Sequence, residues 1–319
     1  MMGANMPVPL RYGGAHTHRL SGEWGINLQN LPTVRGSKGK SKLRQGLCAP
    51  EGYSVIAADL GQIEARLVAW ICGALPLLQQ FRARLDPYAI MGSLIFGYPV
   101  DPKVHLLERF IGKTAILGLG YGCGATKFYN MVIMLARTLG IDLGTMWTME
   151  LAQQSVDTYR TVNAPIQYSW RKLDQAIRTA WLGKGGPVQF LPCTIEYGEV
   201  KLPSGLSLKY DRPAFDFETG EHTFYYGKFK HKIYGAKLLE NIVQALARIV
   251  VMNAALRIAD RGYKFALQAH DELVFVVPNS EVDIAKKIIH EEMVRPPSWA
   301  PDLPLTASIG VGVNYGEAK

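Results

Sequence analysis

The chain of 319 residues is predicted to fold as an α+β protein, in which both ends of the sequence build one sheet domain and the middle forms a mainly helical insertion. Three observations predict this class. Short runs typical of strands occur at residues 53–59, 265–277 and 305–315. Helical periodicity, punctuated by glycine and proline, dominates residues 76–182. Residues 186–230 alternate between apolar and polar side chains, which is typical of β-structure.

These changes of pattern divide the chain into three predicted segments. They are the first part of the sheet domain at residues 1–82, the helical insertion at residues 83–232, and the second part of the sheet domain at residues 233–319. Within the insertion, a β-hairpin appendage is expected to turn at Ser204 and Gly205. An amphipathic helix is expected over residues 236–260.

Composition argues against several classes of protein. The four cysteines show no paired spacing, so neither a zinc knuckle nor a disulfide framework is indicated, and a reducing cytosol fits. The longest apolar stretch, residues 238–259, is interrupted by three charged residues and predicts a buried helix rather than a membrane span. The first ten residues lack the pattern of a signal peptide. A net charge of +8 favours a polyanionic partner, although many proteins merely carry a basic surface.

Two aspartates, Asp59 and Asp271, each close a short apolar run. Asp59 is expected at the exposed end of the strand at residues 53–59, and Asp271 on a tight turn between two strands. Two carboxylates held close together repel each other unless a cation lies between them, which predicts a Mg²⁺ site. The alternative is that each aspartate only caps a strand or a turn.

The residues that flank these aspartates are candidates for a binding pocket. Gln62, Ile63 and Glu64 are expected to form a wall beside the metal site. His270 and Glu272 flank Asp271 and are expected to support it. The alternatives are a surface helix for Glu64 and a structural hydrogen bond for His270.

A basic stripe lies in RFIGKTAILGLGYG, residues 109–122. On a helix, residues at positions 109, 113, 117 and 121 advance about 40° per step and form one face about 18 Å long. Arg109 and Lys113 would offer charge to phosphates, and Leu117 and Tyr121 would offer surface to a base and a sugar. The face therefore suits a nucleoside triphosphate. A solvated basic face above a buried Leu and Tyr is the alternative.

The glycine-rich segment GYGCGA, residues 120–125, also satisfies the glycine pattern of dinucleotide-binding turns, with Asp142 further along. This match is weak because no clear second parallel strand precedes Asp142. The glycines more simply permit close approach of the backbone to a ligand or a template.

Three sequence motifs resemble those of family A DNA polymerases, the bacterial DNA polymerase I group, and most closely its phage-type members. DLGQIEAR resembles the first family motif, RFIGKTAILGLGYG the second, and QAHDELVF, with its H-D-E core, the third. AHTHRLSGEWGINLQNLP, LLENIVQALAR and IGVGVNY extend the resemblance from about Arg11 to the last residue.

The resemblance implies a right-hand polymerase fold, with both aspartates in a palm domain and the basic stripe in a fingers domain, placed in a bacterial or phage-infected cytoplasm. It implies a DNA polymerase whose Asp59, Asp271 and Leu60 carbonyl bind two Mg²⁺ ions, with Mn²⁺ as a substitute, and whose catalytic residues include Lys113. The implied dNTP-binding residues are Gln62, Ile63, Glu64, Arg109, Lys113, Leu117, Tyr121 and His270. Glu64 would exclude a ribose 2′-hydroxyl. The implied primer and template contacts are Arg19, Asn27, Gln29, Arg35, Gln244 and Glu272.

The sequence departs from the family pattern in several respects, two of which bear most on function. Leu117 replaces an aromatic residue, which is expected to alter fidelity or sugar selection. Eighteen residues precede Arg19, where relatives carry a thumb and usually an exonuclease domain. A truncated chain, a separate thumb or exonuclease chain or processivity factor, and a minimal enzyme all remain open.

Two other functions compete with a DNA polymerase. A single-subunit RNA polymerase shares the palm architecture, but Glu64 and the H-D-E core argue against it. A non-catalytic nucleic-acid-binding subunit would suit the basic charge, but the intact Asp59, Asp271 and Lys113 argue against it.

Overall fold

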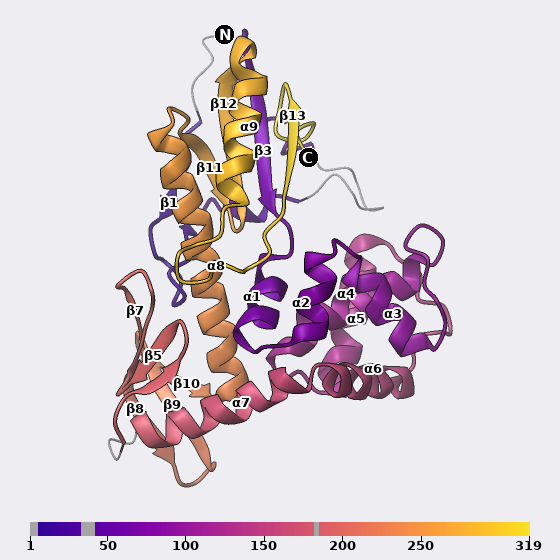
Figure 1. Ribbon diagram of the computed structural model, residues 1–319, viewed down its shortest axis with the longest axis vertical. Coiled ribbons are helices and arrows are strands. Elements are labelled where there is room, and N and C mark those ends of the chain that lie inside the picture. Colours follow the sequence, from indigo (N-terminus) through magenta and orange to yellow (C-terminus); the bar gives the residue numbers. More distant parts are fainter. Residues whose placement is uncertain (1–5, 33–41, 182–184) are drawn as a thin grey trace. The chain divides into compact units, whose positions relative to one another are not determined.

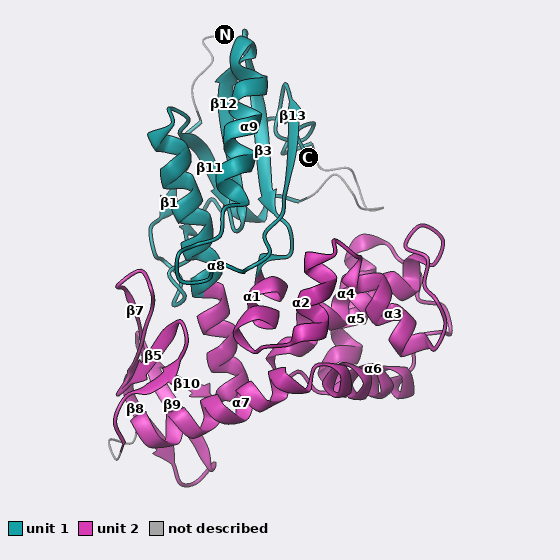
Figure 2. Ribbon diagram, viewed as in Figure 1, with its two compact units in different colours: residues 1–63, 245–319 teal, residues 64–244 magenta. Residues whose placement is uncertain are grey.

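The computed structural model describes residues 6–32, 42–181 and 185–319. The chain forms two compact units, which are coloured separately in Figure 2. Unit 1 consists of residues 1–63 and 245–319, and unit 2 of residues 64–244. Each unit is described by itself.

Unit 1 is built on a four-stranded antiparallel sheet with the strand order β11-β12-β3-β13 (Figure 1). The strands are β3 (Tyr53–Leu60), β11 (Phe265–Ala269), β12 (Glu272–Pro278) and β13 (Ala307–Gly312). Strand β3 comes from the first part of the sequence and lies between two strands from the last part. The predicted sheet, built from both ends of the chain, is therefore confirmed.

Strand β3 is apolar along most of its length because both of its faces are covered. Val55 and Ala57 belong to a buried cluster that includes Leu28 and Tyr315. Helix α9 (Val282–Met293) packs against β3 and β13. Side chains alternate along a strand, so these packing partners bury both sets of β3 residues and hold the end of the strand rigidly.

Short elements of unit 1 precede β3. They are β1 (Leu10–Arg11), β2 (Ser21–Gly22) and the 3-10 turn η1 (Leu28–Asn30). Strands β1 and β2 pair in antiparallel fashion, and a second 3-10 turn, η4 (Asn279–Glu281), leads from β12 into α9.

Unit 2 is mainly helical, as predicted. Its helices are α1 (Ile63–Ile71, which begins at the unit border), α2 (Leu75–Arg82), α3 (Pro87–Phe96), α4 (Leu106–Gly118), α5 (Ala125–Leu139), α6 (Met149–Val162) and α7 (Ala164–Ala176). The short turns η2 (Leu119–Tyr121) and η3 (Ile177–Trp181) follow α4 and α7. Helices α3 and α4 approach each other closely at Gly112, where a Cβ atom would lie 2.1 Å from the Tyr88 carbonyl oxygen.

The β appendage is larger than the hairpin that the sequence predicts. It contains a sheet of order β4-β5-β6-β7 and a second of order β10-β9-β8. The strands are β4 (Val188–Phe190), β5 (Cys193–Glu196), β6 (Glu199–Lys201), β7 (Ser207–Lys209), β8 (Asp211–Asp216), β9 (Glu221–Tyr226) and β10 (Phe229–Ile233). The predicted turn at Ser204 and Gly205 joins β6 to β7. Gly198 and Gly227 make further turns with positive φ, and such short strands give little periodicity to detect.

Helix α8 (Gly235–Asp260) confirms the predicted long buried helix. Among the helices of the described residues, it alone is long and apolar enough to cross a membrane, and 67% of its apolar window is buried, as in a core helix. It belongs to unit 2 as far as Gln244 and to unit 1 from Ala245.

The compact units divide at different residues from the predicted domains. A Cβ atom at Gly235 would lie 1.9 Å from the Trp170 carbonyl oxygen, and Asn241 donates a hydrogen bond to the Tyr210 hydroxyl over 3.1 Å. The first turns of α8 thus pack within unit 2, which extends beyond the predicted boundary at residue 232. Unit 2 likewise begins at residue 64 rather than 83. The division into palm and fingers stays a prediction.

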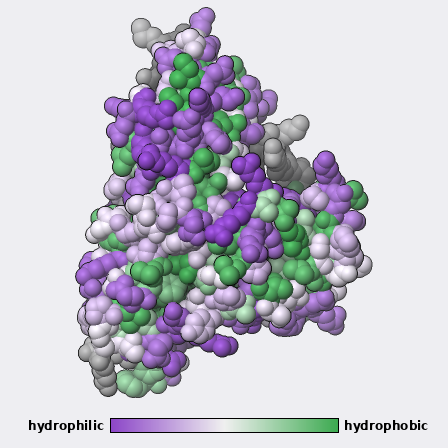
Figure 3. Space-filling view, viewed as in Figure 1, coloured by the Kyte–Doolittle hydropathy of each residue, from purple (hydrophilic) through white to green (hydrophobic). Residues whose placement is uncertain are grey.

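The surface is mixed in character. Figure 3 shows hydrophobic patches over the helices of unit 2, whose exposed apolar side chains include Leu75, Leu85 and Leu94. Hydrophilic side chains predominate over α9 in the same view. Singly exposed apolar residues are normal in folded proteins, so these patches alone indicate no binding surface.

Candidate active site

Asp59 and Asp271 lie at the same edge of the unit 1 sheet. Asp59 is next to last in β3 and pairs in register with Glu272, the first residue of β12. Asp271 lies in the turn between β11 and β12, where His270 has a φ of 55°. The Leu60 N–H donates a hydrogen bond to the backbone oxygen of Asp271 over 3.1 Å. The structure therefore brings the backbones of the two aspartates together, as the sequence predicts.

Two cations lie near Asp59. Burial raises the pKa of the Asp59 carboxyl, whereas the positive charges of Lys319 and Arg44 lower it. Burial lowers the pKa of the Lys319 ammonium, and the nearby Asp59 opposes that shift. Sequence reasoning missed both cations because neither belongs to a family motif and only the fold brings them to β3.

Arg44 is a fixed part of this region. Its Nε and Nη2 atoms donate to the Leu31 carbonyl oxygen over 3.2 and 2.9 Å, and its guanidinium lies 4.8 Å from the centroid of the Tyr315 ring. Its side chain is buried, and Nη1 has no hydrogen-bond partner within residues 6–32, 42–181 and 185–319. Such a held cation can influence Asp59 without moving.

Glu272 is buried, with 1% of its surface exposed. Its Oε2 atom accepts a hydrogen bond from the Lys319 ammonium, while Oε1 has no hydrogen-bond partner in the described part of the chain. The carboxylate thus faces Lys319 rather than solvent in this structure, and a primer contact by Glu272 stays a prediction.

The donor atoms at this edge fit a divalent magnesium site. Asp59 and Asp271 carry carboxylate oxygens at one edge of the sheet, and Leu60, whose carbonyl is the third predicted ligand, follows Asp59 directly. Hard oxygen ligands are those that Mg²⁺ prefers. Within residues 6–32, 42–181 and 185–319, no group of three or more His, Cys, Asp and Glu residues forms a metal site by itself.

The predicted primer and template residues of unit 1 have structural partners. Asn27 caps η1 by accepting a hydrogen bond from the Gln29 N–H over 3.2 Å, and Gln29 is buried. His270 Nε2 lies 3.3 Å from the Asn30 side-chain oxygen, which ties the aspartate turn to η1. Arg19 lies just before β2, within the described residues. Arg35 lies outside them.

In unit 2, Arg109 and Lys113 lie on one face of α4. Both cations approach the Tyr88 ring, at 5.5 and 5.9 Å from its centroid. Arg109 Nε also donates to Asp86 Oδ2 over 2.7 Å, and Asp86 caps the start of α3. These two residues thus share the helix face that their spacing predicts, and their binding of phosphates stays a prediction. Gln244, at the end of the unit, donates to Glu240 Oε1 over 3.3 Å.

The expectation that Tyr121 continues the α4 face is wrong. Helix α4 ends at Gly118, and Tyr121 lies on the 3-10 turn η2. Trp170 Nε1 donates to the Gly120 carbonyl oxygen over 2.9 Å, so this oxygen is bonded outside the helix. Gly122 then ends the turn with a φ of 79°.

Tyr121 and Glu64 are nevertheless neighbours, as a shared pocket requires. The Tyr121 hydroxyl donates to Glu64 Oε2 over 3.2 Å. Burial and the Glu64 charge hold the pKa of the Tyr121 phenol well above its usual value, so the phenol keeps its proton. Leu117, one turn earlier on α4, is 41% exposed.

Comparison with known proteins identifies the family. The sequence model of DNA polymerase family A matches residues 10–179, which is more than half of the chain. The chain belongs to DNA polymerase family A. Its relatives include the DNA polymerase of Bacillus phage SP02, which is 32% identical over 280 residues, 83% of this chain and 41% of the relative. DNA polymerase I of Chloroflexus aurantiacus is 29% identical over 309 residues, 95% of this chain and 28% of the relative.

A solved structure of this family shares the fold. It is the POL domain of Pol1 from M. smegmatis in complex with DNA primer-template and dNTP, with a TM-score of 0.69 and 22% identity. The match covers 97% of this chain and 48% of that chain. The family A chain thus spans less than half the length of these relatives.

Two other features of the family A chain do not contribute to the predicted site. The segment at residues 120–125 follows helix α4 and the turn η2 rather than a strand, so the dinucleotide pattern there is accidental.

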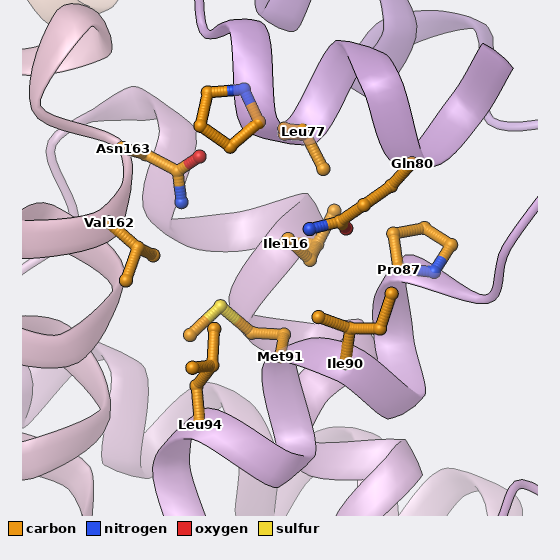
Figure 4. A pocket seen from close by; sticks show the side chains of 10 residues that line it. Leu77, Gln80, Pro87, Ile90, Met91, Leu94, Ile116, Val162 and Asn163 are labelled. Atoms are coloured by element: carbon orange, nitrogen blue, oxygen red, sulfur yellow. The ribbon is translucent and has the colours of Figure 1, made fainter. Parts of the chain in front are cut away.

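A cavity of about 320 Å³ in unit 2 is shown in Figure 4. It is lined by Pro76, Leu77, Gln80, Pro87, Ile90, Met91, Leu94, Ile116, Val162 and Asn163, none of which is a predicted site residue.

The predicted site residues fall into two groups. The metal-binding candidates and His270 belong to unit 1, whereas Glu64, Arg109, Lys113, Leu117 and Tyr121 belong to unit 2. Within each unit, the structure brings several predicted residues together. The assembly of one pocket from both groups stays a prediction.

Proposed function

We propose that this chain is the catalytic core of a template-directed DNA polymerase that adds dNTPs to a primer 3′-hydroxyl. The observation that carries the proposal is the close approach of the Asp59 and Asp271 backbones, joined by the 3.1 Å hydrogen bond from Leu60. Membership of DNA polymerase family A supports it. The Pol1 neighbour, which was solved with DNA primer-template and dNTP, supports the same class of ligands.

Asp59, Asp271 and the Leu60 carbonyl would hold two Mg²⁺ ions, and Mn²⁺ would serve as a substitute. When bound, the ions would lower the pKa of the primer hydroxyl and neutralise charge on the transferring phosphoryl group. The chain contributes a rigid β-strand end and a tight turn, which fix the two carboxylates before the ions bind. Arg44 and Lys319 offset part of the negative charge at Asp59.

The side chains of unit 2 would bind the incoming nucleotide. Arg109 and Lys113 share one face of α4 and offer hydrogen-bond donors and positive charge to a triphosphate. His270 of unit 1 would join them. Tyr121, held to Glu64, would lie at the nascent base pair, and Glu64 would exclude a ribose 2′-hydroxyl.

Primer extension with Mg²⁺ and dNTPs tests this function. Asp59→Asn and Asp271→Asn should each reduce kcat by about a thousandfold or more, because charge stabilisation of the transferring phosphoryl group is lost. Asp142→Asn is the matched control, since Asp142 is an exposed carboxylate that only accepts a local hydrogen bond from Gly144. Extension that survives both site substitutions would contradict the assignment.

Two further measurements separate the alternative functions. A preference for ATP over dATP would indicate a single-subunit RNA polymerase. Salt-sensitive DNA binding without extension would indicate a non-catalytic subunit, or one that needs a separate thumb or exonuclease chain. Primer extension by this chain alone is then compared with extension by the chain plus such a partner. Extension only with the partner would indicate a partner-dependent enzyme rather than a non-catalytic subunit.

A further inference from the structure

Arg248 is a buried arginine on α8, in the part of the helix that belongs to unit 1. Its exposed fraction is 6%. Two of its guanidinium nitrogens, Nε and Nη2, are buried and have no hydrogen-bond partner among the described residues. Across residues 6–32, 42–181 and 185–319, no carboxylate forms an ion pair with it. The guanidinium is therefore a buried cation without an anion.

Two other arginines of unit 1, in contrast, have hydrogen-bond acceptors. On the same helix, Arg257 donates through Nε to Glu292 Oε2 over 2.8 Å and through Nη2 to the Glu292 carbonyl oxygen over 2.7 Å. Arg44, which is as buried as Arg248, donates twice to the Leu31 carbonyl oxygen. A buried charge with unsatisfied donors is costly, so its presence in a folded protein calls for a partner from outside the described residues.

Tyr12 covers the guanidinium. The Arg248 Cζ atom lies 4.8 Å from the centroid of the Tyr12 ring, which stabilises the cation through the face of the ring. Tyr12 itself is 70% exposed. A rotation of this exposed side chain would uncover the guanidinium without disturbing the core, so a ligand can approach from the surface.

We propose that Arg248 and Tyr12 form a binding site for a phosphate group of the nucleic-acid backbone. A planar guanidinium with adjacent free donors matches the oxygens of a phosphodiester in a bidentate geometry, and a net charge of +8 favours such a polyanion. The choice of DNA over another phosphate rests on the proposed polymerase function. The hydroxyl of Tyr12 would remain beside the bound phosphate as a further hydrogen-bond donor.

The test measures equilibrium binding of a primer-template duplex by fluorescence anisotropy, without dNTPs or divalent metal, over a series of salt concentrations. Arg248→Met removes the charge and keeps apolar volume in the core. It should weaken binding by about tenfold or more and reduce the slope of log affinity against log salt by about 0.9. Arg248→Lys keeps the positive charge but loses the pair of guanidinium donors, so it should weaken DNA binding less than Arg248→Met does.

The control is Arg261→Gln, which removes the same charge from an exposed residue that is already paired with Glu291. It should change both affinity and slope less than Arg248→Met does. Unchanged affinity and slope in Arg248→Met would overturn the proposal. This test measures DNA binding and not primer extension. Failure of the proposed phosphate site can therefore be distinguished from failure of the proposed polymerase function.

Thermal unfolding without DNA gives a second readout. If Arg248 has no partner until a ligand binds, Arg248→Met removes an unsatisfied buried charge and should raise Tm. If Arg248 instead pairs with a carboxylate of another protein segment, the same substitution should lower Tm, which would overturn the proposal. The binding measurement is repeated with millimolar inorganic phosphate. If the phosphate abolished the difference in DNA affinity between Arg248→Met and the unaltered protein, the site would bind free phosphate, and the proposal would be overturned.

Discussion

Replacing Tyr121 with Phe removes the hydrogen bond to Glu64 and leaves the ring in place. The bond joins the Tyr121 oxygen to Glu64 Oε2 over 3.2 Å, which is longer than is usual for a hydroxyl donor. A hydrogen bond to a charged group contributes about 1.5–3 kcal/mol at best, so a bond of this length is expected to contribute about 1 kcal/mol to the free energy of unfolding. The structure thus predicts a measurable but modest coupling between the two side chains.

A double-mutant cycle measures that coupling. Urea unfolding of the unaltered protein, Tyr121→Phe, Glu64→Ala and the double variant should give an interaction energy of about 1 kcal/mol. The same four proteins are assayed for kcat/KM with dATP and ATP. If the bond positions Glu64 against a ribose hydroxyl, Tyr121→Phe should relax the discrimination by roughly fivefold, the equivalent of 1 kcal/mol.

An interaction energy within about 0.3 kcal/mol of zero would refute the reasoning, because the effects of substitutions at distant, independent sites are additive to within the same margin. Normal coupling with unchanged sugar discrimination would keep the bond but remove its role in sugar selection. The unfolding measurement does not depend on catalysis, so the two results separate structure from function.

Three other predictions follow from single sites. Gly112→Ala should lower the free energy of unfolding by about 2–3 kcal/mol, since its Cβ atom would meet the Tyr88 backbone, whereas Gly186→Ala, in open space, should not. Lys113→Ala should raise the KM for dNTP about tenfold or more with less effect on kcat, and an unchanged KM would contradict the role of α4. The folded protein binds the Asp59 proton more tightly than the unfolded chain does, so ionisation of Asp59 destabilises the fold above its unfolded pKa. In metal-free buffer, Asp59→Asn should therefore raise Tm at about pH 7 and leave it nearly unchanged below about pH 3, as differential scanning calorimetry can check.

The sequence predicted the elements whose signals are local and strong. Strand β3 is a continuous apolar run that ends in a carboxylate, and α8 keeps helical periodicity over 26 residues. The turn that carries Asp271 is short and polar between two apolar runs, so its geometry was also predictable. The approach of Asp59 to Asp271 followed from these two features together.

Other parts of the site depend on tertiary contacts that no local pattern records. Arg44 and Lys319 lie near Asp59 only because the sheet and the segment after β13 bring them there. Trp170 donates a hydrogen bond to the Gly120 oxygen, beside Tyr121, from about fifty residues later in the chain. The unpartnered guanidinium of Arg248 was likewise invisible, since the sequence shows only a charge within an apolar helix.

The position of β3 between β12 and β13 has a consequence for how the chain folds. Strand β3 is complete at Leu60, yet both of its neighbours lie beyond residue 271, so the sheet must wait for a segment more than two hundred residues later. Residues 64–244 are contiguous, and their contacts can form while synthesis continues. The sheet that carries both aspartates is therefore the late-forming part of the molecule, closed by contacts of high sequence separation. Until then, β3 is an exposed apolar strand with two open edges, the feature most prone to mispairing during folding.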